Sequence, residues 1–165
     1  GSMLYFSAIA AAQSRIWLSS PYFVPDQDVM AALKNAALRG VDVRILLPSK
    51  PDHRVVYLAS FYFMKLTGKK GVRFFRYSDG FMHQKVMLID DFGVAIGTAN
   101  LDNRSFRLNF EVTLLGVNYE LASQVDAMFL RDFAKSREVS YDEIDRRNIL
   151  FKLGAAAARL FSPVL

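Results

Sequence analysis

The chain has 165 residues, of which 52% are hydrophobic and 22% are charged, so it is long enough for one domain with a sizeable core. Its formal net charge of +5 suits anionic partners, such as phospholipid head groups or nucleic acid, without choosing between them. The absence of cysteine excludes disulfides and thiolate metal sites, and the two histidines lack zinc-ligand spacing, so we expect no metal and no cofactor.

Helices and strands alternate along the predicted fold. In chain order, the sequence predicts a helix over residues 4–14, a strand over 15–19, a helix over 27–38, a strand over 41–47, a helix over 53–66, strands over 72–76, 82–90, 94–97 and 110–117, a helix over 119–135 and a last helix over about 141–165. This alternation indicates an α/β/α sandwich with a mixed, mostly parallel central sheet.

The chain contains no repeat, no linker and no signal peptide, and no apolar run is long enough to span a bilayer. Residues 1–3, Gly-Ser-Met, are typical of a cloning remnant, so we expect residues 4–165 to form a single lobe of a longer protein. The helix over 53–66 is apolar nearly all round, and the sequence leaves open whether it is buried or docks on lipid or on a further lobe.

Two helix starts have recognisable caps. Asp26 is predicted to cap the helix over 27–38, and Asp52 the helix over 53–66. His53 is therefore interpreted first as a helix-start residue, with a place on the rim of the site as the alternative. Tyr22 follows the first strand, and ligands in such sheets bind beyond the carboxyl ends of strands. Core packing is favoured for Tyr22, and it is also a candidate wall of the site.

The stretch from His83 to Glu111 is where we expect the chemistry. His83 and Lys85 are two residues apart, so in a strand they share one face. The apolar residues that follow predict a strand buried on both sides. A polar pair at the end of such a strand is costly to bury unless it meets a partner or a ligand, which indicates a site.

The wider spacing is more specific than His-x-Lys alone. His-x-Lys-x4-Asp is followed by Gly-Thr-x-Asn and then by an acid on a further apolar strand. This pattern resembles the HKD motif of the phospholipase D superfamily, in which His, Lys and a downstream Asn gather around one phosphate. The matching residues are His83, Lys85, Asp90, Thr98, Asn100 and Glu111.

Each matching residue type suits phosphoryl transfer. A neutral imidazole such as that of His83 can attack phosphorus and form a phosphohistidine intermediate. Glu111 would accept the proton on the other ring nitrogen and fix the tautomer. Lys85 and Asn100 would hold the non-bridging oxygens, and Thr98 would add a hydroxyl donor.

Asp90 lies on the opposite face of the predicted strand from the phosphate. We therefore interpret it as a structural anchor that pairs with an arginine, although it gives the motif its third letter. The Asp-Phe-Gly at residues 91–93 is predicted to be a turn, because no Gly-rich loop or catalytic loop of a kinase accompanies it.

One histidine supplies only half of such a site. The leaving alcohol needs a proton from a general acid opposite the nucleophile, and the chain has no second His-x-Lys. Phospholipase D-like proteins pair two such lobes, so the resemblance implies a second HKD lobe, in cis or as a homodimer.

The flanking sequence narrows the resemblance to the carboxyl-terminal lobe of the bacterial cardiolipin synthase family, over nearly the whole chain. The similar segments are Ser20–Asp26, Leu38–Pro48, Lys50–His53, Asn100–Glu111 and Ala158–Leu165, with Thr98 where serine is commoner. The resemblance implies phosphatidyl transfer between two phosphatidylglycerol molecules, giving cardiolipin and glycerol. It also implies a peripheral catalytic domain of a membrane-anchored protein at the bacterial cytoplasmic membrane. Two roles stay open for His83, nucleophile and general acid; by family habit the histidine of the first lobe attacks, which would make His83 the acid.

Two other interpretations remain open at this point. One is a homodimeric phosphodiesterase that acts on DNA, which we disfavour because the chain is rich in Phe, Tyr and Met rather than in a groove of Lys and Arg. The other is a scaffold or membrane-docking lobe that is catalytically idle when isolated. We expect the isolated lobe to have little activity unless it dimerises.

Overall fold

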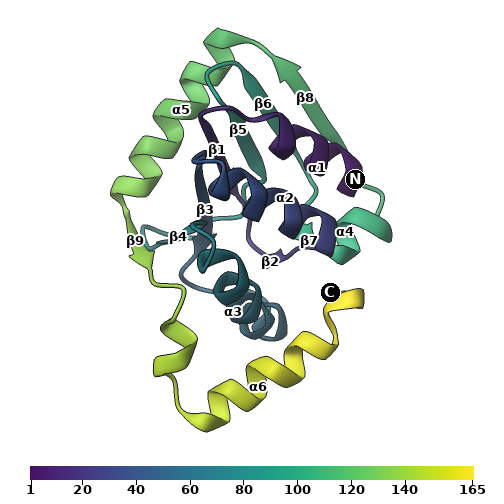
Figure 1. The fold of residues 1–165 in the computed structure, drawn as a ribbon, viewed down its shortest axis with the longest axis vertical. Helices are drawn as coiled ribbons and strands as arrows, with labels where there is room; N and C mark the ends of the chain where they lie inside the picture. Colours follow the sequence, from purple (N-terminus) through teal and green to yellow (C-terminus); the bar gives the residue numbers. More distant parts are fainter.

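A seven-stranded sheet lies between two layers of helices in the computed structural model, which describes residues 1–165 (Figure 1). The strands are β1 (Arg15–Ser19), β2 (Phe23–Val24), β3 (Asp42–Pro48), β4 (Arg73–Tyr77), β5 (Val86–Ile89), β6 (Gly93–Gly97), β7 (Leu101–Asp102), β8 (Thr113–Val117) and β9 (Ser136–Val139). The helices are α1 (Ser2–Ala11), α2 (Gln27–Leu38), α3 (Arg54–Gly68), α4 (Asn103–Arg107), α5 (Tyr119–Ala134) and α6 (Ile149–Leu160), with 3-10 turns η1 (Glu143–Arg146) and η2 (Ser162–Val164). The predicted sandwich is confirmed.

The strand order in the large sheet is β8-β6-β5-β1-β3-β4-β9, and β2 and β7 form a separate parallel pair. Within the large sheet, β1 pairs in parallel with β3 and β3 with β4. The pairs β1–β5, β5–β6, β6–β8 and β4–β9 are antiparallel. The sheet is mixed as predicted, but the predicted predominance of parallel pairing is wrong. Parallel neighbours need long crossovers, whereas β5 and β6 are joined by a short turn at residues 90–92.

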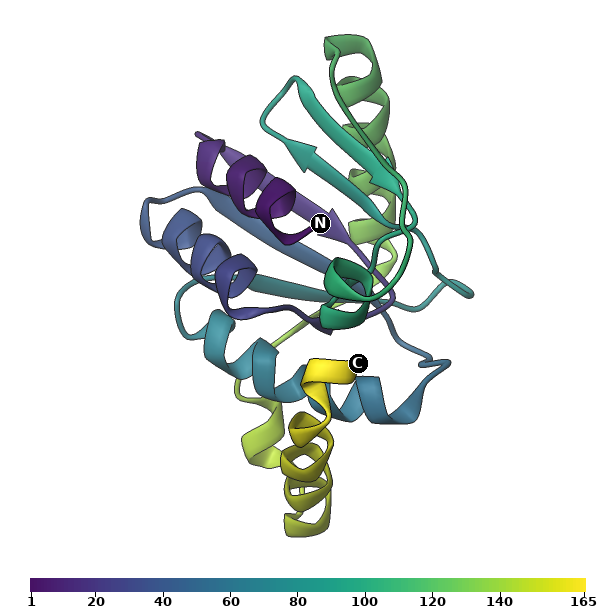
Figure 2. The same cartoon turned by 90° about the vertical axis from the view of Figure 1, so that its right-hand side faces the viewer.

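The helices cover both faces of the sheet. On one face α1, α2 and α3 bury the larger core, which includes Ile9, Leu33 and Phe63. On the other face α5 packs Phe129 against Trp17 of β1, with 6.0 Å between the ring centroids. Figure 2 shows α1 and α2 on one side of the sheet and α5 on the other. None of these helices combines the length and the hydropathy needed to cross a bilayer.

The apolar helix α3 is buried rather than exposed. It packs on the sheet side through residues such as Phe63, and α6 covers its outer side. Phe61 of α3 meets Phe151 of α6 edge-on, with ring centroids 5.1 Å apart. The sequence left open whether this helix is buried or docks on lipid or a further lobe, and the structure favours the buried helix. The exposed apolar face belongs to α6 instead.

The C-terminal region differs from its prediction. The single helix expected over about 141–165 is wrong: η1 comes first, and α6 begins only at Ile149. Asn148 sets this start, because its Oδ1 accepts the backbone N–H of Phe151 at 2.9 Å. The edge strand β9 was not predicted. It is only four residues long and mostly polar, so it gives no apolar alternation.

Candidate active site

The candidate residues gather at one end of the sheet, where β1 and β6 end and β5 begins. Backbone contacts bring their segments together. The hydroxyl of Ser20, just after β1, accepts the N–H of Leu101 at 3.0 Å, next to Asn100. The carbonyl of Lys85 accepts the N–H of Gly97 at 3.2 Å. The N–H of Thr98 reaches the carbonyl beside Glu111, that of residue 112, at 2.9 Å.

His83 does not lie in a buried strand. β5 begins at Val86, so His83 and Lys85 belong to the loop before it, and the His83 side chain is 46% exposed. The prediction of a strand from residue 82 is therefore wrong, and with it the argument that the pair is buried. The imidazole stacks on Phe81 at 5.6 Å and meets the edge of Tyr22 at 6.4 Å between centroids. The ring is thus supported on two sides and open to an incoming ligand.

Lys85 is held close to His83. Its Nζ donates to the backbone carbonyl of His83 at 2.8 Å. Burial lowers the pKa of Lys85, and the negative charge of Glu111 partly offsets this effect. A half-buried ammonium next to the imidazole is well placed to attract a phosphate oxygen.

Asp52 is a site residue that the sequence did not reveal. It was predicted to cap α3, but the residue at the cap position is His53, which makes no side-chain capping bond. The Asp52 carboxylate instead accepts the hydroxyl of Tyr22 at 2.9 Å and lies 3.8 Å from Nδ1 of His83. Burial and the hydrogen bond to Asp52 raise the pKa of Tyr22 to about 12, so this hydroxyl stays a donor at neutral pH.

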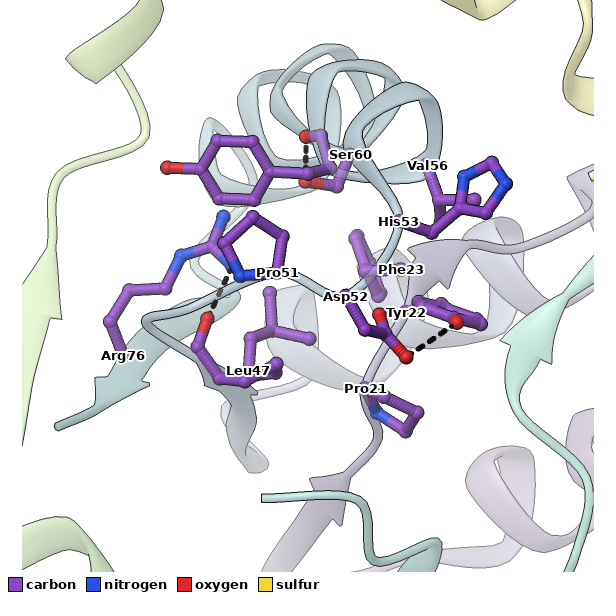
Figure 3. Close-up of a pocket in the computed structure, with 12 residues that line it drawn as sticks. Pro21, Tyr22, Phe23, Leu47, Pro51, Asp52, His53, Val56, Ser60 and Arg76 are labelled. Atoms are coloured by element: carbon purple, nitrogen blue, oxygen red, sulfur yellow. Dashed lines mark hydrogen bonds between the residues drawn. The ribbon is translucent and has the colours of Figure 1, made fainter. Parts of the chain in front are cut away.

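A small pocket opens beside this pair and is drawn in Figure 3. Tyr22 and Asp52 line it and point toward each other, and His53 stands at its rim. At the other end lies the buried Arg76, whose Nη1 donates to the carbonyl of Pro48 at 3.0 Å. Tyr22, for which core packing was favoured, packs partly buried against the larger core and also lines this pocket. His53 is at the start of α3, as favoured, and lines the pocket as well.

Glu111 and Thr98 form a pair of their own. Glu111 precedes β8 instead of lying in a strand, because β8 begins at Thr113. Its Oε2 accepts the Thr98 hydroxyl, and its Oε1 accepts the amide of Asn109 at 3.1 Å. Burial opposes ionisation of Glu111, but these hydrogen bonds outweigh it and lower its pKa. No hydrogen bond joins Glu111 to His83, and the donor of Thr98 is occupied by Glu111.

Asn100 lies beside a buried acid. Burial raises the pKa of Asp102, and hydrogen bonds from the Ser105 backbone and from Asn100 counteract this rise. Oδ1 of Asn100 is shielded from solvent and has no hydrogen-bond partner. A buried amide oxygen without a partner is costly, so Asn100 is not placed there by packing alone.

Asp90 lies at the far end of β5, away from His83. Its carboxylate accepts the backbone N–H groups of Gln13, Ser14 and Arg15 at 2.7–3.1 Å, and also the hydroxyl of Ser14. The geometry fits the anchor that was expected, but the predicted pairing with an arginine is wrong. The guanidinium of Arg15 pairs with Asp91, at 2.6 Å, and with a carboxylate of α5.

The layered mixed sheet and the exposed His-x-Lys beside an Asn and an acid define the class: a phospholipase D-like lobe. Solved structures agree. Nuc from Salmonella typhimurium, a phospholipase D family member, superposes with a TM-score of 0.75 at 26% identity, over 84% of this chain and 90% of that chain. The phosphatidylserine synthase of Haemophilus influenzae superposes with a TM-score of 0.76 at 18% identity, over 97% of this chain and 44% of that chain, which bears on the fold alone.

The sequence comparisons are more specific. The model of the family described as "Cardiolipin synthase, PLD-like domain" matches residues 5–133, so the chain belongs to this family. It is 54% identical over 164 residues to cardiolipin synthase A of Pseudomonas putida and 55% identical to that of Pseudomonas fluorescens. These matches cover 99% of this chain and 34% of each relative, so the chain spans about a third of the length of the curated relatives it matches.

Proposed function

We propose that this chain supplies one half-site of a phosphatidyltransferase that converts two phosphatidylglycerol molecules into cardiolipin and glycerol. The observation that carries the proposal is the exposed His83 imidazole, held between two aromatic rings with Lys85 and Asp52 beside it. The similarity to cardiolipin synthase A over 99% of the chain supports this choice of substrate over other phosphodiesters.

The chemistry proceeds in two displacements. An imidazole nitrogen of one lobe attacks phosphorus, the P–O bond to the glycerol head group breaks, and an acid of the other lobe protonates the leaving oxygen. A hydroxyl of the second phosphatidylglycerol then attacks the phosphohistidine, gives its proton to that same group, and breaks the P–N bond. The family's order of lobes gives His83 the role of the acid.

The neighbouring residues have distinct tasks in this scheme. Lys85 stabilises the negative charge on the non-bridging oxygens, and Asn100 takes the same task through its amide group. Tyr22 holds Asp52 in place next to Nδ1 of His83, 3.8 Å from its carboxylate. Glu111 and Thr98 act as a pair that adds negative charge near Lys85.

A second lobe is needed for the other histidine, and the edge of the sheet offers it a surface. β8 is the last strand, so its outer edge is unpaired. Exposed apolar side chains continue from the segment around Glu111 along this strand: Leu108, Phe110, Val112, Leu114, Leu115 and Val117. An exposed apolar edge of this kind is typical of a surface that binds another chain or domain. We assign it to a second lobe of the same fold, in cis or as a second copy, at a bacterial membrane surface.

The test is His83→Ala in the full-length protein, assayed for cardiolipin and glycerol with phosphatidylglycerol vesicles. We expect product formation to fall about 10²–10⁴-fold, the range of acid–base catalysis, with unchanged folding by circular dichroism. Product formation by Lys85→Ala should fall as well. The matched control Lys70→Ala, on the exposed turn after α3, should keep full activity. Near-normal synthesis by His83→Ala, or cleavage of plasmid DNA without any cardiolipin from the unmodified protein, would reject the proposal.

A further inference from the structure

The outer face of α6 is apolar from end to end. Leu150 is 75% exposed and Leu160 is 78% exposed, and the other side chains on the outer face of the helix are also apolar. The exposed apolar residues of α6 and the turn after it are Ile149, Leu150, Leu153, Ala156, Ala157, Leu160, Phe161 and Val164. At about 100° per residue they fall on one side of the helix. A helix face of this composition is costly to leave in water.

The inner face of α6 is already used. Ala155 and Ala158 are buried, and Phe151 packs on Phe61 of α3. Packing against the rest of the lobe therefore fixes the orientation of α6. The helix cannot rotate to bury its outer face without exposing the inner one. The apolar surface of α6 is separate from the edge of β8, since the two lie at opposite ends of the long axis in Figure 1.

The charges around this face have one sign. From Asn148 to Leu165 the only charged side chains are Lys152 and Arg159, and neither is in an ion pair. They are seven residues apart, so they lie on the same flank of α6, between its two faces. The guanidinium of Arg159 sits 4.0 Å above the ring of Tyr62.

The cationic flank continues beyond the helix. The groove between α2, α3 and the end of α6 is lined by Arg159, Lys34 and Arg107. Two acids also line it: Asp26, which caps α2 and lies 3.7 Å from Arg107, and Asp28 in the first turn of α2. On α6 itself both charged side chains are cations, and an apolar face bordered by cations matches a surface with an apolar interior and anionic head groups.

We propose that the outer face of α6 lies in the surface of a bilayer that contains anionic phospholipid, with Lys152 and Arg159 at the level of the head groups. Twelve residues give a helix of about 18 Å, too short to span the hydrocarbon layer but suited to lying in its plane. The long stems of the two cations allow their charges to reach the phosphates while the apolar side chains are buried. The proposal concerns contact with the bilayer and does not depend on the chemistry proposed above.

The test is flotation of the chain with vesicles of phosphatidylcholine alone and of phosphatidylcholine with phosphatidylglycerol. We expect binding to the anionic vesicles that weakens at least threefold between low and high salt. Leu150→Glu with Leu153→Glu should lower vesicle binding at least tenfold, and Lys152→Gln with Arg159→Gln should remove the preference for anionic vesicles. The matched control Leu38→Glu, an equally exposed leucine at the end of α2, should bind like the unmodified chain.

Folding of each variant is checked by circular dichroism and by the fluorescence of Trp17. Failure of the unmodified chain to bind anionic vesicles would overturn the proposal, as would equal binding by the double leucine variant. Sedimentation that shows self-association of the chain, abolished by the same leucine changes, would assign the face to a second copy and would overturn it too. A protein that binds vesicles through α6 but makes no cardiolipin would reject the proposed function alone.

Discussion

Asp90 offers the sharpest test of the structural reasoning. Asp90 as a residue is 5% exposed, and its carboxylate collects three backbone N–H groups and one hydroxyl from the junction between α1 and β1. The perturbation is Asp90→Asn, which keeps the shape of the side chain. It also keeps a residue that tolerates the positive φ of 50° at this position, so backbone strain does not confuse the result.

The magnitude follows from the donors. All four donors reach Oδ1, the position that the amide oxygen of asparagine takes, and only Gln13 also reaches Oδ2. Hydrogen bonds to a charged acceptor contribute about 1.5–3 kcal/mol each and those to a neutral acceptor about 0.5–1.5 kcal/mol, so loss of the charge weakens each of them by about 1 kcal/mol. We therefore expect a loss of about 3 kcal/mol in the free energy of unfolding. For a chain of this length, that loss corresponds to a fall of about 6–12 °C in Tm. The control is Asp91→Asn, because Asp91 is next in sequence, is 77% exposed and makes a surface pair that contributes less than about 1 kcal/mol.

The assay is urea unfolding followed by the fluorescence of Trp17, the only tryptophan, which is buried against α5. Burial disfavours the Asp90 carboxylate, but the backbone hydrogen bonds outweigh it and lower its pKa. A lowered folded-state pKa means that the stabilisation is complete above the unfolded value of about 3.9 and is lost as pH falls through the folded value. The difference between the unmodified chain and Asp90→Asn should therefore be constant at neutral pH and shrink below about pH 4. A loss under about 1 kcal/mol, or one equal to that of Asp91→Asn, would refute the anchor.

Three further predictions test the site and the packing. Tyr22→Phe removes the donor to Asp52 and should lower kcat/KM of the full-length protein about tenfold, the value of one hydrogen bond of about 1.4 kcal/mol; an unchanged kcat/KM would contradict the role given to this pair. The Thr98 hydroxyl donates to Glu111 and accepts a backbone N–H. Thr98→Val removes this hydroxyl and should lower the free energy of unfolding by about 1–2 kcal/mol in urea, whereas Thr98→Ser should keep the stability of the unmodified chain. Gly68→Ala places a Cβ against the side chain packed over the end of α3 and should destabilise by about 1–3 kcal/mol, whereas Gly116→Ala, with open space around it, should be neutral; equal Tm values for the two would count against the packing described.

Local signals were sufficient wherever the determining residues are close in sequence. α2 spans the predicted residues, and Asp26 caps it as expected by accepting the N–H of Val29 at 3.0 Å. The hairpin between β5 and β6 and the helix α5 were also predicted from turn residues and apolar periodicity. In these elements the local preference and the tertiary fold agree, which is the condition under which such predictions succeed.

The sequence-based predictions are wrong where residues distant in sequence determine the local structure. The run before Val86 has the pattern of a strand, but pairing with β1 ends where Ser19 meets Val86, and on the other side β6 adds only the hydrogen bond from Gly97 to Lys85. His83 therefore lies in a loop, and the exposure of its imidazole follows from where β1 and β6 end rather than from its own sequence. Asp52 was assigned to α3 for a similar reason. Its competing partner, the hydroxyl of Tyr22, is 30 residues away and invisible to local reasoning.

The two exposed apolar surfaces, the edge of β8 and the outer face of α6, lie outside the core of the lobe. The core beneath the sheet is closed, with α3 covered by α6, so neither the edge of β8 nor the outer face of α6 is needed to hold the lobe together. Substituting a single exposed leucine by glutamate on either surface should leave Tm nearly unchanged, because surface positions outside the core contribute within about 0.5 kcal/mol. The consequences of such changes should instead appear where each surface meets its partner: in catalysis for the β8 edge, which adjoins Glu111, and in vesicle binding for α6. A surface leucine whose loss lowered Tm by several degrees would mean that the lobe depends on that face for its own folding, and the assignment of separate partners to the two ends of the molecule would fail.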